Sequence, residues 1–66
     1  MIEEYSLVKT LVEKKGFPAG TIGVVVSLYS SGPACEVEVW DETHYPVDVV
    51  TYEFDELEVI EDPPKM

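Results

Sequence analysis

TIGVVVSLYSSGPACEVEVW, residues 21–40, holds the two strongest strand signals of the chain and the turn between them. Thr21–Tyr29 is dominated by β-branched and aliphatic side chains, which favour strands. Ser30-Ser31-Gly32-Pro33 has the composition of a turn. In Ala34–Trp40, apolar and acidic residues alternate, which is typical of an antiparallel strand with one face in solvent. The stretch therefore predicts a β-hairpin.

A period of two assigns the side chains of this hairpin to opposite faces. In the second strand, the core side is expected to carry Cys35, Val37 and Val39, and the solvent side Glu36, Glu38 and Trp40. In the first strand, we expect the core face to carry Ile22, Val24, Val26 and Leu28. Gly23 then falls on the other face, where a glycine marks a bulge, a bend or a close backbone approach.

The rest of the chain adds three strands and no long helix. The strands are expected at Tyr5–Val12, Val47–Phe54 and Leu57–Ile60, with a short helical turn at residues 55–57 and a frayed tail from residue 61. A helix over Ile2–Lys15 is the weaker alternative, because its β-branched residues favour a strand and no N-cap precedes it. Sixty-six residues with five short strands predict one all-β domain, a small barrel or curled sheet, over residues 1–66.

Three segments carry a resemblance to known proteins. Pro18-Ala19-Gly20-Thr21-Ile22-Gly23-Val24-Val25-Val26 resembles the Pro-x-Gly-x-x-Gly-x-Val-Val segment of SH3-like barrels, including those with a KOW-type motif. Ala34–Trp40 is similar to a Tyr-Glu-Val-Glu-Phe segment in a family of small bacterial proteins of unknown function, although Cys35 replaces the usual tyrosine. Val50-Thr51-Tyr52 and Asp55-Glu56-Leu57 look like the closing strand, turn and final leucine of that family.

The resemblance covers roughly Tyr5 to Ile60 and implies a fold and an origin. The fold is a small five-stranded SH3-like barrel with a short helical turn before the last strand, and the origin is a bacterial cytoplasm. Some members of the family look like companions of toxin-type proteins, as antitoxins or immunity proteins. The resemblance implies no enzymatic activity, and a fold alone does not determine function.

The charge is unusually negative and unevenly distributed. Fourteen acidic residues face four lysines and no arginine, for a net charge of −10. Three of the lysines lie within the first fifteen residues, whereas eleven carboxylates lie between Glu36 and Asp62. Such a surface repels nucleic acid and anionic membranes and attracts a basic protein. The acidic N-terminus does not resemble a secretion signal, so a cytoplasmic location is expected.

The residues give little support to catalysis, a cofactor or a metal site. Cys35 and His44 are the only cysteine and histidine, and we expect Cys35 to be buried and unreactive. A loose calcium site at Asp41, Glu42 and Asp48 is a weak alternative, because the spacing matches no EF-hand loop. No enzyme is therefore predicted.

The acidic side of the hairpin is the candidate partner-binding face. It comprises Glu36, Glu38, Trp40, Asp41, Glu42 and Tyr45. One alternative is a purely solvated face, with Trp40 covered by the N-terminal segment or by the Tyr45–Pro46 loop. The leading hypothesis is a non-catalytic interaction module, in its most specific form an antitoxin or immunity-type protein that masks a basic partner. A structural accessory domain and KOW-like binding to RNA or a ribosome are alternatives, and exposed strand edges also allow a homodimer.

Overall fold

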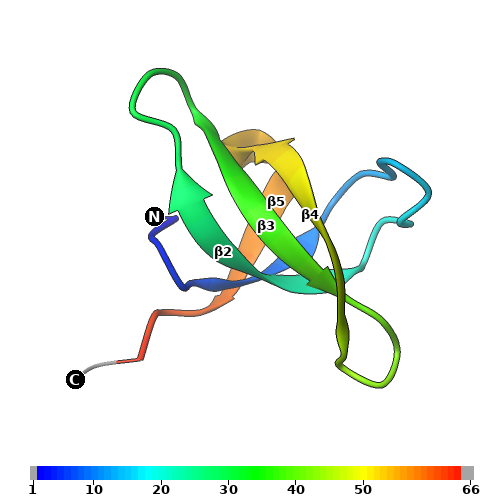
Figure 1. Cartoon of the computed structure of the whole chain (residues 1–66). Coiled ribbons are helices and arrows are strands. Elements are labelled where there is room, and N and C mark those ends of the chain that lie inside the picture. The colour runs from blue at the N-terminus through cyan, green and yellow to red at the C-terminus, as the bar shows by residue number, and fades with distance from the viewer. Residues whose placement is uncertain (1, 65–66) are drawn as a thin grey trace.

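The computed structural model describes residues 2–64 and shows five strands in one antiparallel sheet that curls on itself (Figure 1). The strands are β1 (Leu7–Thr10), β2 (Ile22–Leu28), β3 (Ala34–Trp40), β4 (Pro46–Glu53) and β5 (Leu57–Glu61). A 3₁₀ turn, η1 (Phe54–Glu56), joins β4 to β5. The order across the sheet is β4-β3-β2-β1-β5, so the first and last strands are neighbours. The prediction of a small five-stranded SH3-like barrel with a helical turn before the last strand is confirmed.

The ends of the elements differ modestly from the predicted ones. The first strand is shorter than Tyr5–Val12, because residues 4 and 5 form a turn in which Tyr5 has a φ of 73°. The alternative helix over Ile2–Lys15 is wrong, since β1 lies within this segment. Glu61 belongs to β5 rather than to a frayed tail, and residues 65 and 66 lie outside the described part of the chain.

The core lies between the two halves of the curled sheet. It consists of Val8, Val25, Cys35, Val37, Val39, Val50, Tyr52 and Leu57. The inward residues predicted for β3 are all fully buried, and Glu36, Glu38 and Trp40 are only partly buried on the opposite face. The predicted inner and outer faces of β3 are therefore both confirmed.

The strand β2 faces the opposite way from the prediction. Val25 is fully buried and Gly23 is buried, whereas Ile22, Val24 and Val26 are only partly buried. The pairing with β3 shifts register between Val25 and Ser27, which places Leu28 opposite the buried Cys35, but Leu28 remains 41% exposed. The expectation that Ile22, Val24, Val26 and Leu28 form the core face is therefore wrong.

The physical reason lies at Gly23, which pairs with Val8 of β1 on one side and with Val39 of β3 on the other. A Cβ atom at this position would lie 2.5 Å from the carbonyl oxygen of Glu38 and 2.8 Å from Cγ1 of Val37. The backbone of β3 thus passes so close that only a glycine fits on the inner side of β2. The close approach expected of this glycine is present, but it occurs inside the barrel.

A second set of contacts fastens the loop between β1 and β2 to the opposite end of the sheet. The ammonium of Lys14 donates a hydrogen bond to Oε1 of Glu56 at 2.8 Å and another to the carbonyl oxygen of Thr51 at 3.2 Å. The same ammonium lies 5.1 Å from the ring centre of Tyr52. At the base of the loop, the buried hydroxyl of Thr10 accepts a hydrogen bond from the Thr21 amide at 3.1 Å.

The contacts of Lys14 also affect β4, which is an edge strand. Three of its backbone groups are bonded within the chain, because Asp48 accepts from the Val49 amide at 2.7 Å, Glu56 accepts from the Glu53 amide at 2.9 Å and Lys14 donates to the Thr51 carbonyl. Edge strands with free backbone groups invite pairing with another chain. These contacts make strand addition at the middle of β4 unfavourable.

Gly23→Ala is expected to destabilise the protein by about 1–3 kcal/mol, the usual cost of overpacking a core. The new methyl group would meet a backbone carbonyl, which cannot move aside as a flexible side chain can. Urea unfolding followed by circular dichroism measures the change, with Ser27→Ala on the outer side of the same strand as the control. Equal stability of the Gly23→Ala variant and the wild type would contradict the close approach.

The Lys14–Glu56 ion pair should make stability depend on pH. The hydrogen bond from Lys14 lowers the pKa of Glu56 below its ordinary value of 4.5, and the hydrogen bond from the Glu53 amide lowers it further, by a smaller amount. The stabilisation is therefore present above that value and is lost as the pH falls through the lowered pKa. We expect Glu56→Gln to be less stable than the wild type at neutral pH, with a difference that shrinks in acid. Urea midpoints measured across this range test it, with Glu4→Gln as control, and a difference that is independent of pH would refute it.

Candidate functional site

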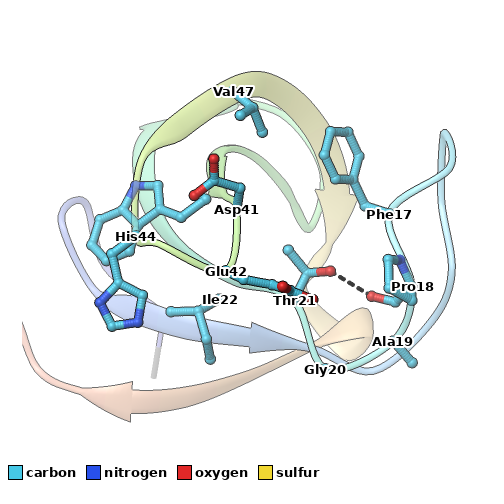
Figure 2. Close-up of a pocket in the computed structure, with 11 residues that line it drawn as sticks. Phe17, Pro18, Ala19, Gly20, Thr21, Ile22, Asp41, Glu42, His44 and Val47 are labelled. Carbon is cyan, nitrogen blue, oxygen red and sulfur yellow. Dashed lines mark hydrogen bonds between the residues drawn. The ribbon is translucent and has the colours of Figure 1, made fainter.

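Two hollows in the surface meet where β3 ends. The first hollow, of about 420 Å³, lies between the loop before β2 and the loop after β3 (Figure 2). The second hollow, of about 730 Å³, lies over the outer faces of β1 and β2 and beside the segment that follows β5. Ile22, Trp40 and His44 line both hollows. We call the two together the double hollow.

The floor and walls of the double hollow are mainly apolar. In the first hollow, Phe17 and Pro18 lie across from Ile22 and His44, and Val47 is 49% exposed (Figure 2). The second hollow is lined by the apolar side chains of Tyr5, Leu7, Ile22, Val24 and Ile60. Several of these side chains are outward because Gly23 occupies the inner side of β2 at the bend. The orientation of β2 therefore creates the apolar surface on which the site is built.

Trp40 stands at the boundary between the hollows and is fixed by contacts from two elements. Its Nε1 donates a hydrogen bond to Oε1 of Glu38 at 3.3 Å, along the same face of β3. The ring of His44 lies 6.0 Å from the Trp40 ring, centre to centre, with an angle of 43° between their planes. Trp40 points outward, as predicted, and remains only partly buried. A partner can therefore reach an indole whose orientation is already set.

The loop between β3 and β4 is preorganised by Asp41. One oxygen of its carboxylate accepts hydrogen bonds from the Thr43 amide at 2.9 Å, the Thr43 hydroxyl at 2.7 Å and the Tyr45 amide at 3.0 Å. The hydrogen bond from the Thr43 hydroxyl is the largest cause that lowers the pKa of Asp41, and the hydrogen bond from the Tyr45 amide is the next. This carboxylate is therefore charged at neutral pH. The loop also holds His44 at a φ of 65°, in the left-handed region. This conformation presents His44 to both hollows.

The six residues proposed from sequence do not all lie in one place. Trp40, Asp41 and Glu42 line the first hollow, and Glu38 is bonded to Trp40. Glu36 lies toward the opposite, N-terminal end of β3, where its carboxylate accepts a hydrogen bond from the Tyr29 hydroxyl at 3.4 Å. Tyr45 is 68% exposed and is not among the residues that line either hollow. Of the predicted face, only the end around Trp40 thus adjoins the double hollow.

Sequence reasoning missed most of the apolar side chains of the site. The sequence pattern predicts Ile22 and Val24 for the core and predicts no role for Leu7 and Ile60. The missed signal is Gly23, because a buried glycine on the inner face obliges its neighbours in β2 to point outward. His44 is not part of the predicted partner-binding face, and Cys35 is fully buried among the core residues rather than in the double hollow.

Among residues 2–64, the charged side chains that line the double hollow are all carboxylates. Asp41 and Glu42 line the first hollow, and Glu61 and Asp62 line the second. The two ion pairs found among residues 2–64 are Lys9–Glu58 at 3.6 Å and Lys14–Glu56 at 2.8 Å, and they involve none of these carboxylates. The apolar surface is thus surrounded by carboxylates that no lysine of the described chain neutralises.

The described residues offer little to catalysis or metal binding. Burial raises the pKa of the Cys35 thiol to about 11, which suppresses the reactive thiolate. Across residues 2–64, no three His, Cys, Asp or Glu side chains are grouped so that they could hold a metal ion. In the same range, no helix has the length and apolar character to cross a membrane.

Comparison with known proteins identifies no relative: no protein-family model, no curated protein and no solved structure matches the chain. The site is therefore interpreted from its own residues.

Cys35 should be inert in the folded protein and reactive only after unfolding. It is 0% exposed and its pKa is about 11, so a thiol reagent at slightly alkaline pH meets neither an accessible nor an ionised sulfur. We expect labelling by a chromogenic disulfide reagent to be complete in denaturant and negligible in native buffer. Rapid labelling of the native protein would show that the β3–β4 half of the core opens readily.

Proposed function

We propose that this protein is a non-catalytic interaction module that docks a basic partner protein on the double hollow. The observation that carries the proposal is the apolar surface around Trp40, lined also by Glu42, Glu61 and Asp62, whose carboxylates take part in neither ion pair of residues 2–64. Protein interfaces commonly have such an apolar centre and a polar rim. The charge of the rim selects a partner of opposite sign.

The geometry of the double hollow supports binding through direct side-chain contacts as well as through electrostatic attraction. Tryptophan is among the residues that contribute most to binding at interfaces. Trp40 is oriented by Glu38 and His44 before any partner arrives, which lowers the entropy cost of association. The loop that carries Glu42 is likewise held in one conformation by the bonds to Asp41.

The most specific form of the proposal is an antitoxin or immunity-type protein that covers a positively charged surface of its partner. Its support is the net charge of −10 and the resemblance of three sequence segments to a family with toxin companions. Direct binding of RNA is disfavoured, because the carboxylates around the double hollow would repel a phosphate backbone.

Reversing the charge of the rim should weaken capture of a partner, while reversal elsewhere should not. We expect Glu42→Lys combined with Glu61→Lys to slow association several-fold and to reduce its dependence on salt, because long-range attraction accelerates encounter. The control, Asp55→Lys combined with Glu4→Lys, has the same net charge and changes residues that line neither hollow. Capture from an extract of the source cells, followed by biosensor measurements on the recovered proteins, tests this.

Three other outcomes would count against the proposal. Recovery of no basic protein would contradict it, and so would equal losses in the two double variants. Partners that bind independently of salt through the same apolar surface would favour an accessory domain of a larger assembly.

A further inference from the structure

We infer that the double hollow binds a short linear segment of its partner, in which a lysine or arginine lies between two apolar side chains. The inference rests on the proposed function and specifies the chemistry of the ligand. Each apolar side chain would enter one hollow, and the basic side chain would cross Trp40. Three features of the site support this arrangement.

The first feature is the division of the surface into two hollows with a common wall. Ile22, Trp40 and His44 form this wall, and the hollows of about 420 and 730 Å³ lie on either side of it. Both volumes fall within the usual range of ligand pockets, roughly 300–1,000 Å³. A concave surface with a central wall fits a ligand with two protruding side chains better than it fits a ligand with a smooth convex face. A flexible chain can place one side chain on each side of the wall.

The second feature is the arrangement of charge around the wall. Asp41 and Glu42 lie on the side of the first hollow, and Glu61 and Asp62 on the side of the second. Glu38 is bonded to the indole through Oε1, and the structure gives its Oε2 no hydrogen bond within the described chain. A cation over Trp40 would therefore be attracted from both sides and by the aromatic ring itself.

The third feature is the complete pairing of β1, β2 and β3, the strands that carry Leu7, Ile22, Val24 and Trp40 of the double hollow. The strands β1, β2 and β3 each pair with a neighbour on both sides, so a ligand cannot add to the sheet there. At the β4 edge, contacts from Asp48, Glu56 and Lys14 occupy three backbone groups. The strand β5, which contributes Ile60 and Glu61, is the other edge of the sheet. Over β1, β2 and β3, a ligand is therefore recognised by its side chains, and a linear segment presents side chains without a folded scaffold.

Selection from a random linear peptide library displayed on phage tests the inference. The target is the wild-type protein, and phage that bind Trp40→Ala are removed. We expect enriched peptides to carry a lysine or arginine between apolar residues. Fluorescence anisotropy with a labelled enriched peptide should show binding at least about tenfold weaker to Trp40→Ala, as for other interface tryptophans. Glutamine in place of the basic residue should weaken binding several-fold, and Asp55→Lys should have no effect.

Circular dichroism first establishes that Trp40→Ala folds, and Val24→Ser with Glu42→Lys replaces it in the same assays if it does not. The inference is wrong if no peptide is enriched, if the enriched peptides lack a basic residue, or if they bind the site variants as well as the wild type. Capture of folded basic proteins without enrichment of any peptide would overturn the inference and leave the proposed function standing. Failure of both experiments would overturn both.

Discussion

The close approach of β3 to β2 at Gly23 is the constraint on which the rest of the structure depends. At this residue, one short strand pairs with β1 on one side and with β3 on the other, and the Glu38 carbonyl occupies the space of a Cβ atom. A larger side chain would push the strands apart. A sheet of five short strands can enclose a core only if it curls tightly. The absence of a side chain at Gly23 permits that curl and brings Val8, Val25 and Val39 together.

The candidate site follows from the same constraint. Because Gly23 and Val25 face inward, Ile22 and Val24 must face outward, where they meet Leu7 and Trp40. This leaves an apolar surface on a molecule whose core is already small. The loop after β3 adds His44 and Glu42 to that surface. One carboxylate oxygen of Asp41 accepts hydrogen bonds from within this loop. The acidic residues near Trp40 thus differ in their contacts: Asp41 fixes the loop after β3, whereas the Glu42 carboxylate makes no hydrogen bond within residues 2–64.

Sequence reasoning succeeded where the two faces of a strand differ in chemistry. In β3, glutamates alternate with apolar residues, so both faces could be predicted correctly. In β2, Ile22, Val24 and Val25 are all apolar, and the alternation carries no information about which face is inside. The orientation of β2 is determined only by the lack of space for a side chain at Gly23, and that lack of space depends on the path of β3. The bond between Lys14 and Glu56 joins residues 42 positions apart and has no local signal in the sequence. Charge directed attention to the end of β3 near Trp40, where the double hollow lies, but carried no information about the apolar surface there.

The pairing of β1 with β5 has a consequence for how the chain folds. The strand that is synthesised first acquires its second neighbour only when the last strand is present. Contacts between distant parts of a chain form slowly, because a long loop must close before they are rewarded. Until then, β1 has an open edge next to the valine-rich hairpin of β2 and β3, and exposed strand edges of incompletely folded chains promote aggregation. The carboxylates of β3 and of the C-terminal half give the incomplete chain a negative charge while it waits. Because a net charge far from zero opposes association, the charge of −10 works against contacts between incompletely folded molecules.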